Sequence, residues 1–451
     1  MRGVDDLSQR DHLRIALLTY RGNPYCGGQG IYTRYLSQEL SQLGHHVEVF
    51  SGQPYPHLDE GVAFTAVPSM DLFRPDDPWH IPRPWEFRGP LDVVETAIMA
   101  TCGFPEPYVF SLRVHRALRK RLSDFDVVHD NQCLGAGMLG VMRDIPLVAT
   151  LHHPITVDRD LDLAHAREHG ASRWRRFTLR RWYGFLGMQM RVARQIPNII
   201  TVSESSRHDI VEQMQVPDAS LSVVPVGVDT QRFRPLPNIE RIPGRIIVTT
   251  SSDVPLKGLI PLLEAVAKVR TENEDAHLIV IGTPRRGSHV PATIERLGIA
   301  GAVTFVSGVD DERFIELYAQ ASMAVVPSLY EGFSLPAIEA MACGVPLIAT
   351  TGGALPEVAG RNGEAALLVP PGDPSALAHA IGTALADPEL RERIGAAGRA
   401  RVLNRYTWRK TAELTVEQYR RAISEQRAGK RPLPAPVALP ETVSTTKAPA
   451  C

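Results

Sequence analysis

Residues 321–360 carry the pattern that most narrows the fold of this chain. Two short apolar runs, 324–327 and 345–349, are typical of strands buried in a parallel sheet. A loop and a short helix are expected between them, with Ser334 capping the helix and Gly344 just past its last turn. The stretch therefore predicts strand, loop, helix and strand, the repeating unit of a doubly wound α/β sheet.

Two carboxylates belong to this unit. Glu331 lies on the predicted loop, and Glu339 lies about one turn inside the predicted helix. Backbone N–H groups at the start of a helix favour an anion, and carboxylates accept hydrogen bonds from hydroxyl groups. The combination suits a sugar phosphate. The alternative is an ordinary α/β unit whose two glutamates face solvent.

The segment EGFSLPAIEAMACGVP, residues 331–346, resembles the signature of the retaining family 4 glycosyltransferases, and the resemblance extends over most of residues 12–425. It implies the GT-B architecture, an α/β fold in which two Rossmann-like doubly wound parallel-sheet domains face each other across a cleft. It also implies that Glu339 holds the ribose hydroxyls of a nucleotide-sugar donor and that Glu331 faces the transferred sugar. The donor phosphate is then expected on the backbone of the next four residues, Gly332, Phe333, Ser334 and Leu335.

A Gly-rich loop that includes Gly27 and Gly28 follows the first apolar run of the chain. Glycines at a strand-to-helix junction let the backbone approach a ligand closely. The resemblance implies that this loop faces the donor diphosphate and the acceptor. After a later predicted strand, Thr150 and His152 match the family position whose histidine points at the transferred sugar; His153 is the alternative.

Lys257 precedes a predicted helix, where an ammonium group and a helix N-terminus act together on phosphate. Members of the family usually have an arginine five residues before this lysine, and this chain has Ser252 there. That departure removes one cation from the diphosphate site, and Arg285 or Arg286 is a hypothetical replacement. By resemblance, the loop that contains Val309 supports the nucleotide base.

The domain boundaries follow from changes in composition. An N-terminal Rossmann-like domain is expected at 12–230, with an irregular Pro- and aromatic-rich insertion at 53–108, and a C-terminal nucleotide-sugar-binding domain at 245–404. By resemblance, a last helix at 405–425 crosses back to the first domain. Residues 426–451 are rich in Pro, Ala and Thr and are predicted to be disordered.

Composition excludes several classes of protein. The 451 residues suit two or three domains, and a net charge of −1 gives no basic surplus for nucleic acid. Five dispersed cysteines without a CxxC pair argue for a reducing compartment and against a disulfide framework or a zinc site. Because neither a signal peptide nor an apolar run of transmembrane length is recognisable, a cytoplasmic protein is expected.

Residues 171–195 are locally basic, and their arginines interleave with aromatic and leucine side chains at helical spacing. One interpretation is an interfacial helix, 173–194, on an anionic lipid surface at the inner face of the membrane. The alternative is a core helix with a solvated arginine face. Nucleic-acid binding is disfavoured because no partner motif accompanies the segment.

The predicted reaction moves a sugar from a nucleotide-sugar donor to a lipid-linked, polysaccharide or small-molecule acceptor with retention of the anomeric configuration. His152 and Glu331 are the catalytic candidates. No cofactor and no essential metal is expected, since no DxD-type metal site is apparent. The alternatives are an epimerase or hydrolase of the same architecture and, because of Ser252, a non-catalytic nucleotide-sugar-binding protein.

Overall fold

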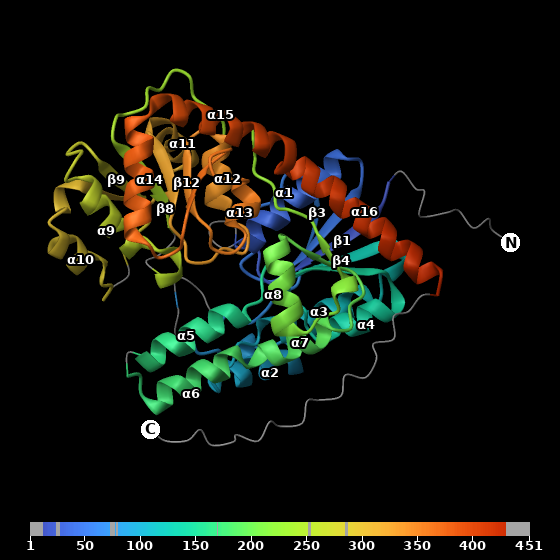
Figure 1. Ribbon diagram of the computed structural model, residues 1–451. Helices are drawn as coiled ribbons and strands as arrows, with labels where there is room; N and C mark the ends of the chain where they lie inside the picture. The colour runs from blue at the N-terminus through green and yellow to red at the C-terminus, as the bar shows by residue number, and fades with distance from the viewer. Residues whose placement is uncertain are drawn as a thin grey trace, which may run out of the picture.

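The computed structural model describes residues 12–23, 28–72, 77, 80–168, 170–250, 254–284 and 287–429, and within these ranges the chain forms two parallel sheets (Figure 1). The first has the order β3-β2-β1-β4-β5-β6-β7. Its strands are β1 Arg14–Thr19, β2 His46–Ser51, β3 Ala63–Ala66, β4 Val127–Asn131, β5 Leu147–Thr150, β6 Ile199–Thr201 and β7 Leu221–Val223. The helices of this domain are α1 Gly28–Gln42, α2 Pro90–Ala100, α3 Glu106–Leu118, α4 Gly137–Asp144, α5 Thr156–Glu168, α6 Arg173–Trp182, α7 Leu186–Ala193 and α8 Glu204–Met214.

The second sheet has the order β10-β9-β8-β11-β12-β13. Its strands are β8 Arg245–Thr249, β9 His277–Ile281, β10 Val303–Val306, β11 Met323–Val326, β12 Leu347–Thr350 and β13 Leu367–Val369. The helices are α9 Leu259–Val269, α10 Val290–Leu297, α11 Asp311–Gln320, α12 Leu335–Ala342, α13 Leu355–Ala359, α14 Pro374–Ala386, α15 Pro388–Arg405 and α16 Trp408–Arg427. The predicted fold class, two Rossmann-like doubly wound domains, is therefore confirmed.

Both sheets reverse their strand order at one place, between β1 and β4 in the first and between β8 and β11 in the second. Helices cover both faces, so the central strands are continuous apolar runs rather than alternating ones. β11, for example, is buried along its whole length. In open sheets of this kind, ligands bind outside the carboxyl ends of the strands at the reversal point. This topology directs attention to the loops after β1, β4, β8 and β11.

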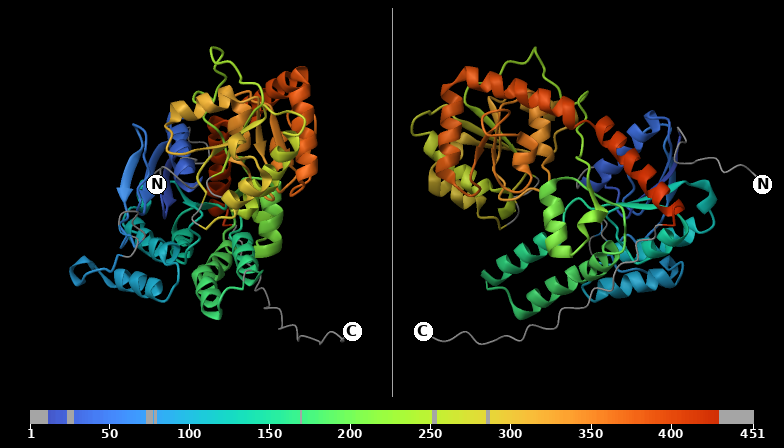
Figure 2. Two further views of the ribbon diagram at one scale, coloured as in Figure 1. Left: turned by 90° about the vertical axis from the view of Figure 1, so that its left-hand side faces the viewer. Right: turned by 45° about the vertical axis from the view of Figure 1, so that its right-hand side comes forward.

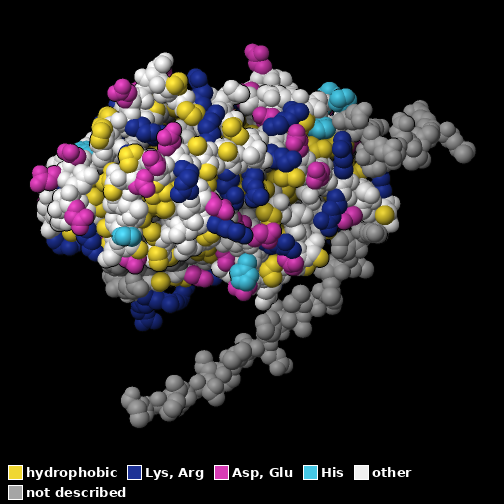
Figure 3. All heavy atoms as spheres, turned by 45° about the horizontal axis from the view of Figure 1, so that its top comes forward, with side chains coloured by type: hydrophobic (Ala, Val, Ile, Leu, Met, Phe, Trp, Pro, Cys, Tyr) yellow, Lys and Arg dark blue, Asp and Glu magenta, His cyan; other side chains and the backbone are white. Residues whose placement is uncertain are grey.

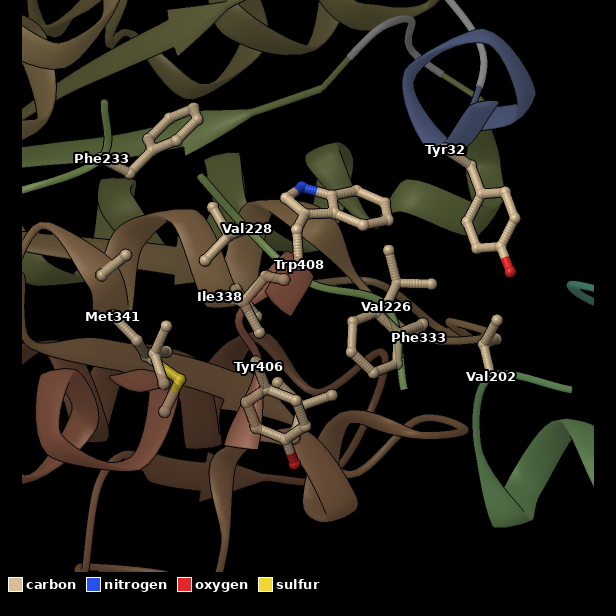
Figure 4. Packing of buried hydrophobic residues seen from close by; sticks show 14 of the residues in the cluster. Tyr32, Val202, Val226, Val228, Phe233, Phe333, Ile338, Met341, Tyr406 and Trp408 are labelled. Carbon is tan, nitrogen blue, oxygen red and sulfur yellow. The ribbon is translucent and has the colours of Figure 1, made fainter. Parts of the chain in front are cut away.

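The two domains share a hydrophobic core. Val202 and Val226 of the first domain belong to the same buried cluster as Phe333 and Ile338 of the second, and Trp408 at the start of α16 lies among them (Figure 4). Burial of apolar surface between the domains stabilises their arrangement, at roughly 25 cal/mol per Å² removed from water.

Helices α15 and α16 carry the chain from the second domain back across the first, as the orange and red ribbons show (Figures 1 and 2). α16 docks through a chain of buried polar groups as well as through apolar contacts. The Tyr419 hydroxyl lies 2.7 Å from His129 Nδ1, and His129 Nε2 lies 2.6 Å from Thr150 Oγ1. The Tyr32 hydroxyl lies 3.1 Å from the same Thr150 oxygen. Burial lowers the pKa of His129 to about 3, so its ring is neutral and offers one donor and one acceptor nitrogen.

Two predictions about local structure were wrong, and the last helix, which crosses back to the first domain as expected, differs from its predicted bounds only at its ends. The segment 53–108 is not irregular, because it contains β3, α2 and the start of α3; β3 pairs in parallel with β2 although it is mostly exposed. Residues 173–194 form two helices, α6 and α7, joined by a 3₁₀ turn at Tyr183–Phe185. The last helix begins at Trp408 and continues to Arg427, past the expected start of the disordered tail; residues 430–451 lie outside the described part of the chain.

Replacing Tyr419 by phenylalanine should lower the free energy of unfolding by about 1–3 kcal/mol, because a buried ring nitrogen of His129 would lose its partner. Chemical denaturation followed by circular dichroism measures this. Tyr35→Phe is a matched control, because the Tyr35 ring stacks on Trp408 of α16 and its hydroxyl has no hydrogen-bond partner among the described residues. Equal losses in the two variants would contradict the role of the hydroxyl.

Candidate functional site

Glu331 and Lys257 meet where the second sheet reverses its strand order. Lys257 lies in a 3₁₀ turn after β8, and Glu331 lies in the loop after β11. The Lys257 Nζ is 2.7 Å from Glu331 Oε1, and Ser328 Oγ donates to the same oxygen at 2.7 Å. Glu331 is 9% exposed, so the pair is largely shielded from water on the carboxylate side. Lys257 is thus already paired in this structure, which the sequence did not indicate.

The next residue, Gly332, joins the second domain to the first. Its carbonyl oxygen accepts hydrogen bonds from Ser203 Oγ at 2.7 Å and from Ser206 Oγ at 3.0 Å, both at the start of α8. A Cβ atom at Gly332 would lie 3.1 Å from the Cβ of His153, so a larger residue would push the loop away from the first domain. The loop after β11 is therefore held against the loop after β5.

A second contact between the domains lies beside the first. The carboxylate of Glu357, on α13, accepts from the backbone N–H groups of Glu204 and Ser205 at 2.8 and 2.7 Å. A carboxylate at that place caps the free N–H groups of α8 and interacts favourably with the helix dipole. The Tyr330 hydroxyl donates to Asp209 on the same helix.

Ser334 does not cap α12, contrary to the prediction. Its φ of 88° places it in the left-handed region, and no side-chain cap hydrogen bond forms. Its Oγ is buried and has no hydrogen-bond partner among the described residues. A strained serine with an unpaired buried hydroxyl, directly before the free N–H groups of a helix, is an arrangement that a bound anion would complete.

Glu339 lies on α12 and is half-buried. Burial raises its pKa to about 7, and the charge of Arg232 opposes this only in part. Near neutral pH this carboxyl is therefore poised between its neutral and charged forms. A ligand that donates hydroxyl hydrogen bonds to it would favour the charged form.

His152 is fixed by the end of β4. Asn131 Oδ1 lies 2.8 Å from His152 Nε2, while the Asn131 amide donates to the Gln29 carbonyl oxygen at 3.1 Å. Because that donation assigns the amide orientation, His152 carries its proton on Nε2 and donates it to Asn131. Gln132 Oε1 accepts from the backbone N–H of His152 at 2.8 Å. Burial lowers the pKa of His152 to about 3, so the ring is neutral.

The other predicted residues are distributed around this centre. Phe333 packs its ring on Tyr406 in the core, so only its backbone is available to a ligand, whereas Leu335 begins α12. Gly28 is the first residue of α1, and Val309 lies half-buried in the loop after β10. Four residues of the sequence predictions lie outside the described residues: Gly27, Ser252, Arg285 and Arg286.

Sequence reasoning missed the residues that support the site. Asn131 and Gln132 directly follow a predicted strand, and that position was the available signal for them. Ser203 and Ser206 carry no local signal for a contact with Gly332. Among the described residues, no group of three or more His, Cys, Asp or Glu side chains could hold a metal ion.

The comparisons with known proteins agree with the fold and the motif. Residues 237–401 match the family described as "Glycosyl transferases group 1", and residues 26–232 match "Glycosyltransferase Family 4". A protein of Mycolicibacterium hassiacum called "MMP alpha-(1->4)-mannosyltransferase" is 50% identical over 414 residues, which cover 91% of this chain and 99% of the relative. A "D-inositol 3-phosphate glycosyltransferase" of Streptomyces scabiei is 28% identical and covers 92% of each chain.

Solved structures show the same fold. Sucrose-phosphate synthase of Thermosynechococcus elongatus superposes with a TM-score of 0.65 at 23% identity, covering 91% of this chain and 99% of the other. Anabaena HepE, solved in complex with UDP, gives a TM-score of 0.63 at 17% identity, covering 90% and 99%. The protein is a GT-B glycosyltransferase. It belongs to the group 1 glycosyltransferases of the family 4 type.

The raised pKa of Glu339 predicts a pH-dependent stability. In the unfolded chain this carboxyl titrates near 4.5, and in the folded protein near 7, so a rise in pH between these values favours the unfolded state. Glu339→Gln removes this contribution. Above about pH 7 the free energy of unfolding of the variant should therefore exceed that of the wild type by about 1–3 kcal/mol, and below pH 4.5 the two should be equal. Urea denaturation at both pH values measures this difference. An unchanged difference across the window would contradict the assignment.

Proposed function

We propose that this protein is a retaining α-mannosyltransferase that moves mannose from a nucleoside diphosphate donor to a hydroxyl group of a mannoside, the 4-hydroxyl by analogy with the relative's name. The relative at 50% identity, which this chain covers almost completely, is called an α-(1→4)-mannosyltransferase. More distant relatives are called D-inositol 3-phosphate glycosyltransferases, so the proposed mannosyl specificity rests on the relative at 50% identity, and the proposed nucleotide site rests on the geometry.

The observation that carries the nucleotide site is the unpaired Ser334 hydroxyl at the start of α12, beside the Lys257–Glu331 pair. A diphosphate placed there would accept from Ser334 Oγ and from the first N–H groups of α12. It would also draw the Lys257 ammonium partly away from Glu331. Glu339, farther along α12, would accept from the ribose hydroxyls.

Transfer begins as the bond from the anomeric carbon to the diphosphate oxygen breaks. Negative charge grows on the diphosphate, where Lys257 and the helix N–H groups stabilise it more in the transition state than in the ground state. The sugar carbon becomes electron-poor, and the Glu331 carboxylate, which lies beside Lys257 and therefore beside the proposed diphosphate, would stabilise that positive charge. The acceptor hydroxyl attacks from the face that the diphosphate leaves and gives its proton to a diphosphate oxygen, which retains the configuration.

His152 orients the sugar rather than exchanging a proton with it. Its pKa of about 3 keeps the ring neutral, and its Nε2–H is already donated to Asn131. Nδ1 is then the ring atom with a free lone pair, which suits a hydrogen bond from a sugar hydroxyl. We propose that transfer requires no bound metal, because a lysine and a helix N-terminus already supply positive charge to the leaving group.

Nucleoside diphosphates give the first test. GDP, UDP and ADP are added separately, and one should raise the melting temperature, because a ligand of the folded state stabilises it by mass action. The matching nucleotide-mannose should then glycosylate methyl α-mannoside, in the presence of EDTA as in its absence, and NMR should show an α-linked product. Glu339→Gln should lower the nucleotide affinity about tenfold or more, whereas Glu389→Gln, an exposed carboxylate on α15, should change nothing. A β-linked product, or activity lost with EDTA, would overturn the corresponding part of the proposal.

We also propose that α6 docks on an anionic membrane surface. Trp174 and Phe177 are stacked on each other and are 68% and 55% exposed, and residues 171–195 contain no Asp or Glu. The face shown in Figure 3 differs, because basic and acidic side chains are interspersed on it. Trp182, in contrast, packs on Phe104, so the exposed aromatic contact would come from the first half of α6, and the arginines would supply charge along the whole helix. Among the described residues, no helix has the length and apolar character needed to cross a bilayer.

Vesicle binding tests this proposal. Changing four arginines of α6 to glutamine should weaken co-sedimentation with phosphatidylglycerol vesicles by about tenfold or more, since each basic residue contributes about 1 kcal/mol near an anionic surface: Arg175, Arg176, Arg180 and Arg181. The matched control changes four exposed arginines of α15 and α16, Arg405, Arg409, Arg420 and Arg427, and should bind as the wild type does. Equal binding by all three proteins would refute the proposal.

A further inference from the structure

A small cavity lies in the first domain at the carboxyl edge of its sheet. Tyr20, Gly52 and Val67, which follow β1, β2 and β3, line it together with the charged residues Glu95, Glu106 and Arg113. The cavity measures about 10 Å³, the room of about one water molecule or one hydroxyl group. It is the kind of space that takes one polar group of a larger ligand.

The acidic side chains around this cavity differ in how well they are paired. Glu95 accepts from the Met70 N–H at 3.2 Å and forms an ion pair with Arg113 at 2.6 Å. Glu106 has one ion pair, from Oε1 to Arg21 at 3.5 Å, and its buried Oε2 has no hydrogen-bond partner among the described residues. A buried carboxylate oxygen without a partner costs stability and calls for an explanation.

The sequence of helix α2 places acidic side chains on the buried side of the helix. Asp92 and Glu95 face inward and are buried, while Val93 and Val94 of the same helix are exposed. This is the reverse of the usual burial pattern of a surface helix. The inward carboxylates hold Arg113 on α3, and α3 presents Glu106 from its first turn.

The cavity is connected to the candidate active site through a short chain of contacts. The Tyr20 hydroxyl accepts from Gln29 Nε2 at 3.4 Å. The Gln29 carbonyl oxygen accepts from Asn131, whose other amide atom holds His152 Nε2. The cavity is therefore a few side chains from His152, and it belongs to the opposite domain from Lys257 and Glu339.

We propose that Glu106 binds one hydroxyl group of the acceptor sugar and that this cavity determines which acceptors are used. The inference rests on the proposed function, since it requires a hydroxylated acceptor beside His152. Oε2 of Glu106 accepts a hydrogen bond from this hydroxyl group, and the cavity has room for one such group. Burial also raises the pKa of Glu106 to about 7, so near neutrality this carboxyl can donate as well as accept.

Kinetics of Glu106→Gln test the proposal, with methyl α-mannoside and an α-(1→4)-linked mannobiose as acceptors. The acceptor KM should rise about tenfold or more, because the neutral amide oxygen of glutamine accepts a weaker hydrogen bond than a carboxylate does. Hydrolysis of the donor without an acceptor, and the melting-temperature shift with the nucleotide, should stay at wild-type values. Glu389→Gln, which is exposed on α15, is the matched control and should leave the acceptor KM unchanged.

Stability separates this role from a structural one. Burial disfavours the charge of Glu106 more than its ion pair with Arg21 favours it, so Glu106→Gln, which has nearly the same shape and no charge, should be as stable as the wild type or more stable. An unchanged acceptor KM in this folded variant would overturn the proposal. Glu106→Asp keeps the carboxylate but withdraws it from the cavity, and it should raise the acceptor KM as well.

Failure of the proposed function would look different. If the wild type uses another sugar, the acceptor KM of Glu106→Gln is compared with that of the wild type for the donor and acceptor pair that the wild type does use. If no pair is turned over, saturation-transfer NMR of methyl α-mannoside with the wild type and with Glu106→Gln replaces the kinetics. Equal saturation transfer from the two proteins, or none from either, would overturn the assignment of Glu106.

Discussion

The carbonyl oxygen of Gly332 is the point on which the arrangement of the two domains depends. Two serines at the start of α8 donate to it, and Glu357 of the second domain caps the same helix. The loop that makes this contact also carries Glu331, which pairs with Lys257. A single short loop therefore joins the domains and shapes the candidate donor site. Each of these hydrogen bonds is worth about 1 kcal/mol, so the contact fixes one arrangement and can still be exchanged during a domain movement.

Local sequence patterns predicted much of the fold because parallel strands buried on both faces are short apolar runs. The unit 321–360 appears as predicted, with β11, α12 and β12 in order. Strand β3 was not predicted, because it is an exposed edge strand without such an apolar run. The break between α6 and α7 was not predicted either, because the periodicity of arginines and aromatic residues continues through the 3₁₀ turn.

The candidate site was less accessible to sequence reasoning, because its key contacts join residues far apart in the chain. The loops after β5, β8 and β11 contain His152, Lys257 and Glu331, and the helix after β11 contains Glu339; these elements can be located from the sequence. The contact of Ser203 with Gly332 spans 129 residues, and nothing local announces it. The prediction for Ser334 was wrong for another reason. A serine before a helix is normally a cap, and only the structure shows that this serine has a strained backbone and an unpaired hydroxyl.

Three carboxyls, that of the buried Asp130 and those of the partly buried Glu339 and Glu106, have their pKa values raised to about 7 by desolvation, and their surroundings distinguish them. Asp130 Oδ2 accepts from the Leu134 N–H at 2.8 Å and so holds the turn in which Gln132 and Leu134 take positive φ values. That turn places Gln132 against His152, which gives Asp130 Oδ2 a structural role, although its buried Oδ1 has no hydrogen-bond partner among the described residues. The Glu339 carboxylate has no hydrogen-bond partner among the described residues, and Glu106 has its ion pair with Arg21 but an unpaired Oε2. Because a carboxyl oxygen withdrawn from water without a partner lowers stability, we propose that hydroxyl groups of the substrates supply the missing partners: ribose at Glu339 and the acceptor at Glu106.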